Sequence, residues 1–346
     1  METSLIDDAA GWRIALAKIG RHESYHTWDF HRIDTHGSAD FFAIEVAAEN
    51  SALFFPVVAR KIPQSECYDL TSVYGYPGPI HVGAPEEFPV MLDAAFTQLR
   101  EMGYVSVFSR CSVFAMRTET ALPACYSQSG KVVAIDLRMP LDAQWRQYRD
   151  NLRREINRAI ADGLECQQAH ADEVSSFIDL YHMTMNRVVA NSHYYFDRRY
   201  VLNMMASADF DCRLYVCKYD GKVISAALFL FCNDVVQYHL SGSDAAYSKL
   251  GASKMLIDYV RRIAAAEGYS VMNLGGGLGG MADHLYSFKR GFSRNEKDFF
   301  VIKKVLNPDA YQTLLSCPGQ QMAGSSDFFP AYRQRAPSLD DDNISV

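Results

Sequence analysis

Hydrophobic and polar positions follow the same pattern in two separate stretches of the chain. In the first stretch, residues 41–47 and 52–59 are apolar runs typical of strands, and the polar residues 49–51 join them as a hairpin. Apolar residues then recur at helical spacing over 86–102, up to Gly103, and 105–108 is typical of a buried strand. This stretch predicts the order strand, strand, helix, strand.

The second stretch repeats this order more clearly. Predicted strands at 214–219 and 222–231 flank Asp220-Gly221, a two-residue hairpin turn, and a third strand is predicted at 235–240. A helix over 252–266 and a strand over 269–274 follow. The repeat is one of element order and not of residue identity. It predicts an α/β protein with mixed sheets, made of two similar lobes at 1–140 and 141–316, with a partly disordered tail at 317–346.

An arginine-rich segment lies between the two stretches. Trp145, Tyr148 and Leu152 begin one apolar face, which predicts a single helix from an N-cap at Asp142 to Gly163. The flanks of this helix carry arginines at 146, 149, 153, 154 and 158. These arginines either face the phosphates of a nucleic acid or remain solvated and salt-bridged on the surface.

The overall composition limits the class of protein. The chain has 346 residues, of which 49% are hydrophobic and 22% charged, so it is globular and neither disordered nor a coiled coil. It shows no membrane-spanning run and no signal-peptide pattern, and we expect a cytoplasmic monomer. The eight scattered cysteines form no CxxC pair, which predicts reduced thiols and no bound metal. A net charge of −7 excludes a general nucleic-acid coat but allows a local basic groove.

Four segments together resemble one known family. They are Tyr-Asp-Leu-Thr-Ser-Val-Tyr-Gly-Tyr-Pro-Gly-Pro at 68–79, Arg-Arg-Glu-Ile-Asn-Arg-Ala at 153–159, Asn-Leu-Gly-Gly-Gly at 273–277 and Leu-Tyr-Ser-Phe-Lys-Arg-Gly-Phe at 285–292. Over residues 20–310 the chain is similar to the Fem-type peptidoglycan bridge-forming aminoacyltransferases, a tandem branch of the GNAT superfamily. The resemblance implies two GNAT-like lobes. It also implies transfer of an acyl or aminoacyl group from an activated ester or thioester to an amine.

The resemblance also implies candidate catalytic and donor-binding residues. Phe288 and Lys289 would act at the reacting carbonyl, where the lysine would stabilise the oxyanion or anchor a phosphate; the alternative is a solvated loop lysine. The glycines at 275–280 either contact a ligand through their N–H groups or reverse the chain. The candidate donor-binding residues are Gly275, Gly276, Gly277, Lys249, Gly251, Ser253 and Arg290.

The expected donor is aminoacyl-tRNA. Acyl-CoA enzymes of the superfamily carry an R/Q-x-x-G-x-G/A loop, and Ser248 and Ser253 replace its first and last residues here. Acyl-CoA or an acyl carrier is the second candidate donor, and a binding module without catalysis is a third reading. Neither enzyme reading requires a cofactor beyond the co-substrate.

The expected acceptor is the amine of a small peptide-like molecule or natural product. Family members that modify cell-wall precursors carry a lysine soon after an early tryptophan, whereas Trp28 is followed by Asp-Phe-His-Arg. Trp28, Tyr74 and Tyr76 would bind the acceptor, or the tyrosine loop is a rigid plug between lobes. Tyr195 lines a pocket or belongs to the core, and His239 is a candidate proton acceptor with the same alternative.

Overall fold

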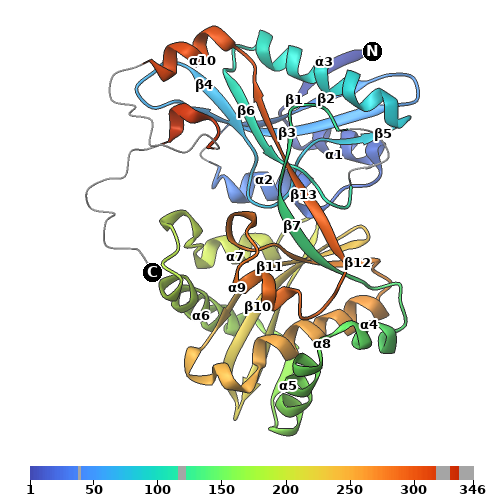
Figure 1. Cartoon of the computed structure of the whole chain (residues 1–346), viewed down its shortest axis with the longest axis vertical. Coiled ribbons are helices and arrows are strands. Elements are labelled where there is room, and N and C mark those ends of the chain that lie inside the picture. Colours follow the sequence, from blue (N-terminus) through green and yellow to red (C-terminus); the bar gives the residue numbers. More distant parts are fainter. Residues whose placement is uncertain (38–39, 116–121, 317–327, 335–346) are drawn as a thin grey trace. The chain divides into compact units, whose positions relative to one another are not determined.

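The computed structural model describes residues 1–37, 40–115, 122–316 and 328–334, which form two compact units (Figure 1). Unit 1 comprises Met1–Gln128 and Phe300–Val346, and unit 2 comprises Ser129–Phe299. Each unit contains a mixed β-sheet with helices packed on it, so the predicted α/β class with mixed sheets is confirmed.

Unit 1 has a sheet with the order β1-β2-β3-β4-β6-β13, and β5 also pairs with β3. The pair β4–β6 is parallel, and the other neighbours are antiparallel. The strands are β1 (Glu2–Ile6), β2 (Phe41–Ala47), β3 (Ala52–Lys61), β4 (Tyr68–Thr71), β5 (Ile80–Val82), β6 (Ser106–Arg110) and β13 (Glu296–Val305). The helices are α1 (Ala9–Ile19), α2 (Trp28–Asp34), α3 (Phe88–Glu101) and α10 (Pro308–Leu315).

Unit 2 has a sheet with the order β8-β9-β10-β11-β12-β7. The pair β11–β12 is parallel, and the other neighbours are antiparallel. The strands are β7 (Tyr126–Asp136), β8 (Glu165–Gln168), β9 (Asp211–Tyr219), β10 (Lys222–Cys232), β11 (Val235–Ser243) and β12 (Val271–Gly275). The helices are α4 (Leu141–Gln147), α5 (Asp150–Ala161), α6 (Val174–Arg187), α7 (Arg198–Met205), α8 (Ala252–Ala266) and α9 (His284–Lys289).

The two units share one topology but exchange their last strands. In each, three antiparallel strands lead into a helix and then into a strand parallel to the third. In unit 1 the last strand of the sheet, next to β6, is β13. In unit 2 the last strand of the sheet, next to β12, is β7. Residues 129–140 therefore belong to unit 2, although they were predicted in the first lobe. Residues 300–316 belong to unit 1, although they were predicted in the second lobe. Local patterns do not indicate which sheet a strand will join.

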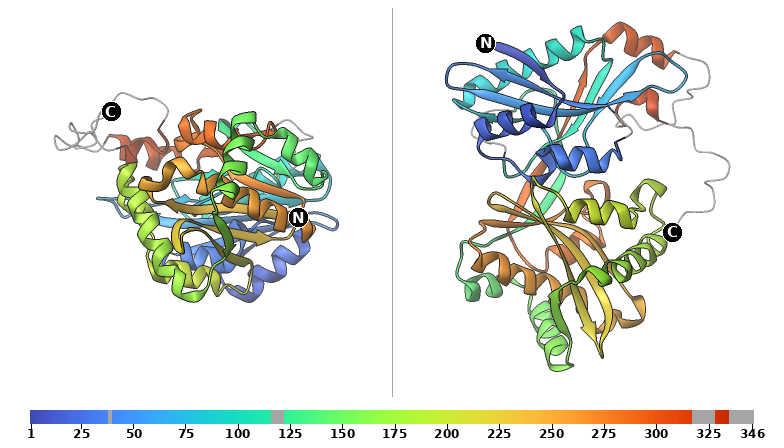
Figure 2. Two further views of the ribbon diagram at one scale, coloured as in Figure 1. Left: turned by 90° about the horizontal axis from the view of Figure 1, so that it is seen from below. Right: turned by 180° about the vertical axis from the view of Figure 1, so that it is seen from behind.

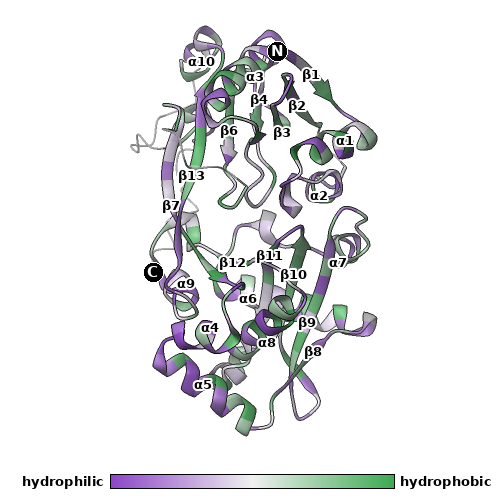
Figure 3. Ribbon diagram, turned by 90° about the vertical axis from the view of Figure 1, so that its right-hand side faces the viewer, coloured by the Kyte–Doolittle hydropathy of each residue, from purple (hydrophilic) through white to green (hydrophobic). Residues whose placement is uncertain are grey.

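Helices cover both faces of the unit 2 sheet. Helices α5 and α8 share an apolar core with Ala227, Phe229 and Phe231, which alternate along β10 and so point to one face. Helix α6 packs along β10 and β11, as the view from behind shows (Figure 2). A Cβ on Gly242 of β11 would overlap the backbone of Leu180, so this glycine allows α6 to lie close to the sheet. Hydrophobic residues follow the central strands, and α5 carries many hydrophilic ones (Figure 3).

The predicted single helix between Asp142 and Gly163 is wrong, because the chain forms two helices there. Tyr148 and Arg149 adopt extended backbone angles between α4 and α5. Tyr148 is buried, its hydroxyl donates a hydrogen bond to Asp258 at 3.0 Å, and the N–H of Arg149 donates to the carbonyl of Gly291 at 2.9 Å. These tertiary contacts outweigh the local helical pattern. Asp142 lies in the first turn of α4 and pairs with Arg146 instead of capping the helix.

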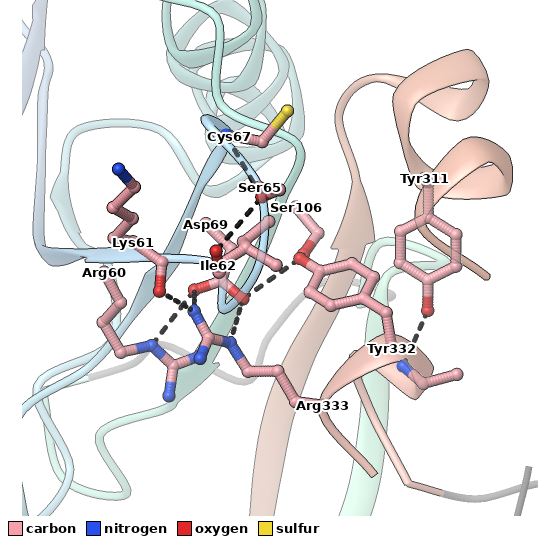
Figure 4. Close-up of polar contacts among 11 residues, drawn as sticks. Arg60, Lys61, Ile62, Ser65, Cys67, Asp69, Ser106, Tyr311, Tyr332 and Arg333 are labelled. Carbon is pink, nitrogen blue, oxygen red and sulfur yellow. Dashed lines mark hydrogen bonds and ion pairs between the residues drawn. The ribbon is translucent and has the colours of Figure 1, made fainter. Parts of the chain in front are cut away.

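A buried carboxylate fastens residues 328–334 to unit 1 (Figure 4). Asp69 of β4 is fully buried and accepts hydrogen bonds from Arg60 at 3.1 Å, Arg333 at 2.9 Å and the hydroxyl of Tyr332 at 3.0 Å. The same hydroxyl lies 2.7 Å from the hydroxyl of Ser106. The rest of the predicted tail, 317–327 and 335–346, lies outside the described residues.

We expect Asp69→Ala to destabilise unit 1 by about 3 kcal/mol, because it leaves two guanidinium groups and a buried hydroxyl without their shared acceptor. Urea unfolding of the full chain measures this. The control is Glu66→Ala, which removes an exposed partner of Lys61 and should cost less than about 1 kcal/mol. Equal losses in the two variants would contradict a special role for the Asp69 cluster.

Candidate active site

Two parallel strands of unit 2 separate at their carboxyl ends. The ladder between β11 and β12 runs from Val235–Val271 to Gln237–Asn273, although both strands continue further. Beyond that point β11 stays with β10, and Gly275 of β12 pairs with β7 after a bulge. The buried side chain of Asn273 donates to that of Gln237 at 2.8 Å and accepts from the N–H of Gly275 at 2.9 Å. This amide pair fixes the point of separation.

The glycine run that follows β12 lies directly against the backbone of β7. A Cβ on Gly276 would lie 2.7 Å from the carbonyl oxygen of Lys131. A Cβ on Gly280 would overlap the carbonyl of Ser129, and one on Gly130 would overlap Gly280 itself. Gly275 and Gly280 also have positive φ angles of 78° and 83°. Glycine is therefore required for both close approach and chain reversal.

Lys289 ends helix α9 and points back at this run. Its side chain is only 8% exposed, and its ammonium group donates a hydrogen bond to the carbonyl of Gly276 at 2.7 Å. Burial lowers the pKa of Lys289 to about 8, although the charge of Asp283 opposes this change. Lys289 is thus not the solvated loop lysine of the alternative reading. Phe288 packs on the core and meets the ring of Phe292 edge-on at 5.5 Å.

Asp283, which the sequence analysis missed, connects the glycine run to the helix that carries Lys289. One carboxylate oxygen accepts the N–H of Tyr286 at 2.8 Å as the N-cap of α9, and the other accepts the N–H of Leu278 at 2.9 Å. Burial opposes ionisation, but these two N–H groups and Lys289 hold the pKa of Asp283 below its usual value. Its signal was an aspartate three residues before Tyr286, typical of a helix start.

The other predicted donor-binding residues lie in two places in unit 2. Gly251 has a left-handed conformation and is the N-cap of α8, and Lys249 is exposed on the turn before it. The Ser253 hydroxyl lies 3.0 Å from that of Ser225. Arg290 follows Lys289 but forms an ion pair with Glu296. The structure therefore brings Lys289 together with Gly275, Gly276 and Gly277, whereas Lys249, Gly251 and Ser253 gather at the start of α8.

His239 and Tyr195 belong to the aromatic residues near α6 and α7. His239 is 7% exposed, and its Nε2 lies 3.1 Å from the hydroxyl of Tyr200. Burial lowers the pKa of His239 to about 3, so its ring is neutral at physiological pH and would be a weak proton acceptor. Tyr195 is half-buried and donates to the side chain of Asn186 at 2.7 Å.

The remaining predicted acceptor residues lie in unit 1. Trp28 packs edge-on against Trp12 and lies 4.6 Å from the ring of Phe41, inside an aromatic cluster. In the tyrosine loop, the N–H of Tyr74 donates to Asp34 at 2.9 Å, and Tyr76 meets Tyr25 edge-on at 5.9 Å. A Cβ on Gly75 would overlap the Tyr25 ring. The loop is thus tightly packed within its own unit.

Comparisons with known proteins assign the fold. Residues 146–290 match the family profile described as "Acetyltransferase (GNAT) domain". The crystal structure of FemX is similar with a TM-score of 0.68 and 13% identity, over 90% of this chain and 99% of FemX. The C-terminal domain of a protein described as a lysylphosphatidylglycerol synthetase from Agrobacterium fabrum has a TM-score of 0.54 and 16% identity, over 89% and 95%. A search of curated protein sequences finds no match.

These similarities confirm a GNAT-type fold, as the sequence predicted. No helix among the described residues is long and apolar enough to cross a membrane. Within the same residues, no group of three or more histidines, cysteines and carboxylates is arranged to hold a metal ion.

We expect Gly277→Ala to displace the glycine run, because the new Cβ would overlap both Met281 and Asp283. Loss of the carbonyl partner at Gly276 should let water reach Lys289 and raise its pKa from about 8 by about one unit or more. NMR titration of the reductively methylated protein, with Lys289→Arg for assignment, measures this. Leu278→Ala in the same run removes an exposed side chain, keeps the backbone N–H that Asp283 accepts, and should leave the pKa in place. Equal shifts in both variants would contradict the proposed contact.

Proposed function

We propose that the chain is an aminoacyltransferase that forms an amide bond, moving an aminoacyl group from aminoacyl-tRNA to the amine of a small peptide-like or natural-product acceptor. The observation that carries this proposal is the buried ammonium group of Lys289 at the glycine run of a GNAT-type fold. The Fem-type resemblance of Phe288-Lys289 and the likeness to FemX support an aminoacyl donor. So does the likeness to the lysylphosphatidylglycerol synthetase domain.

The reaction needs few protein groups. The acceptor amine attacks the ester carbonyl carbon, a C–N bond forms, and the C–O bond to the tRNA ribose breaks. The ribose oxygen leaves as a hydroxyl group and takes up the proton that the amine loses. Negative charge develops on the carbonyl oxygen in the transition state, where a fixed cation in a poorly hydrated site is most effective. Lys289 meets this requirement, because among the described residues its ammonium group donates a hydrogen bond to a neutral carbonyl, which does not cancel its charge. Asp283 would be a positioning residue.

Acyl-CoA is the second candidate donor, and one observation favours it. The profile matched by residues 146–290 is that of acetyltransferases, and the start of α8 at Gly251 occupies the position of the CoA loop in the resemblance. Two observations stand against it. Ser253 replaces the small apolar residue of that loop, and its hydroxyl is within hydrogen-bond distance of the Ser225 hydroxyl. A binding module without catalysis would retain the fold without a need for the buried Lys289.

The donor assignment predicts activity that depends on RNA. Labelled amino acid carried by an aminoacyl-tRNA mixture should be transferred to an amine acceptor pool of small peptides, and ribonuclease added beforehand should abolish the transfer. A parallel reaction with acyl-CoA thioesters, followed by mass spectrometry of the acceptors, is the control. Transfer that survives ribonuclease and requires CoA would overturn the donor assignment while retaining acyl transfer.

Lys289→Ala should lower turnover on the order of 100-fold, as expected for loss of one group that stabilises an oxyanion. The matched control is Lys297→Ala, which removes an exposed lysine of the same unit and should retain turnover. Melting temperatures of both variants show whether the fold is intact. Turnover within a few-fold of wild type for Lys289→Ala would make this lysine a bystander.

The pH dependence of turnover distinguishes a role of Lys289 as a cation from a role as a general base. Because the pKa of Lys289 is lowered to about 8, its charge is lost as pH rises through that value, whereas an arginine keeps its charge. The ratio of wild-type to Lys289→Arg turnover should therefore fall above about pH 8. Taking this ratio cancels the titration of the acceptor amine. A ratio that rises above pH 8 would indicate that the neutral lysine acts as a base.

A further inference from the structure

We infer that Cys166 and Cys217 are a thiol-modification site that closes reversibly to a cross-strand disulfide. The two residues lie directly opposite each other on the antiparallel strands β8 and β9. Opposite residues of such a pair project from the same face of the sheet. Both side chains contact the core beneath α8, and both thiols are free.

The hydrogen-bond pattern places this pair at the closer type of position. The N–H of Ala169 donates to the carbonyl of Leu214 at 2.8 Å, and these two residues face each other when the β8–β9 register, which ends at Gln168–Tyr215, is continued by one residue. Hydrogen-bonded and non-hydrogen-bonded pairs alternate along an antiparallel ladder. Counting back three residues makes Cys166–Cys217 a non-hydrogen-bonded pair. Its Cα atoms are then about 4.5 Å apart, inside but near the short limit of the range that disulfides span.

The two thiols differ in access. Cys217 is fully buried, whereas Cys166 is half-buried and can be reached from solvent. The neighbouring Cys217 thiol and burial raise the pKa of Cys166, which makes the thiolate scarce at neutral pH. Oxidation should therefore be slow and should accelerate as pH rises.

Oxidised glutathione can form this disulfide by thiol–disulfide exchange in two steps. The Cys166 thiolate attacks oxidised glutathione, which forms a mixed disulfide and releases one glutathione thiolate. Cys217 then attacks the sulfur of Cys166, which releases the second glutathione. Two protein thiols become one disulfide, and one glutathione disulfide becomes two glutathione thiols, so electrons and protons balance. Reduced glutathione or dithiothreitol reverses both steps by the same thiol–disulfide exchange.

The structural effect would fall on the edge of the unit 2 sheet. Strand β8 has four residues and is the terminal strand beside β9. A covalent link would prevent this edge strand from separating. It would also restrict α5, which precedes β8 and pairs through Glu155 with Lys254 of α8.

The test uses the full chain treated with oxidised glutathione at pH 8, then alkylation, proteolysis without reductant and mass spectrometry. The expected product is a peptide linking Cys166 to Cys217 that dithiothreitol separates, with slower hydrogen exchange in β8 after oxidation. Cys217→Ser should stop at the glutathione adduct of Cys166, and the control Cys212→Ser should still form the link. Alkylation of both thiols without any link, or a link from Cys166 to another cysteine, would overturn the inference. Neither result depends on the donor or acceptor.

Discussion

The candidate site depends on one constraint, the close backbone contact between the start of β7 and the glycine run after β12. Gly130 and Gly280 lie so near each other that a Cβ on either would overlap backbone atoms. This contact turns the chain after Gly275 and presents the carbonyl of Gly276 to Lys289. Asp283 then fixes the run to α9 through its two carboxylate oxygens. The position of the lysine thus follows from a backbone contact that only glycine permits.

The contact in turn depends on the exchange of strands. Strand β7 follows β6 in sequence but completes the sheet of unit 2 beside β12, and β13 completes the sheet of unit 1 beside β6. Neither sheet can therefore be completed by one continuous segment of chain. The pairing of β6 with β13 joins residues almost two hundred positions apart, and such pairings require loop closure before they stabilise the fold. The glycine run of unit 2 therefore packs against β7, a strand that directly follows the elements of unit 1 in the sequence.

Local pattern predicted the elements well where packing agreed with it. The strand Phe41–Ala47 and the helix Ala252–Ala266 were predicted with their observed bounds, since one sheet or helix face is buried in each. The prediction was wrong at Tyr148, where a buried hydroxyl and its partner Asp258 break the helix. It also missed β13 and Asp283, because strand exchange and a cap shared between two segments are tertiary properties. Lys289 was found through the family resemblance, and its burial was visible only in the structure.

The environment of Lys289 differs from that of a lysine buried for packing alone, and this difference supports the role proposed for it. A lysine buried for packing alone would be paired with a carboxylate or would extend its ammonium group to water. Among the described residues Lys289 pairs with no carboxylate: it is buried, its ammonium group donates to a neutral carbonyl, and the nearby Asp283 uses its oxygens to accept backbone N–H groups. The charge is consequently destabilised, as its lowered pKa records, but it is not neutralised. Such a cation gains more from an anion that forms beside it than a solvated lysine would. In the proposed reaction, that difference would favour the transition state of acyl transfer over the uncharged ester that precedes it.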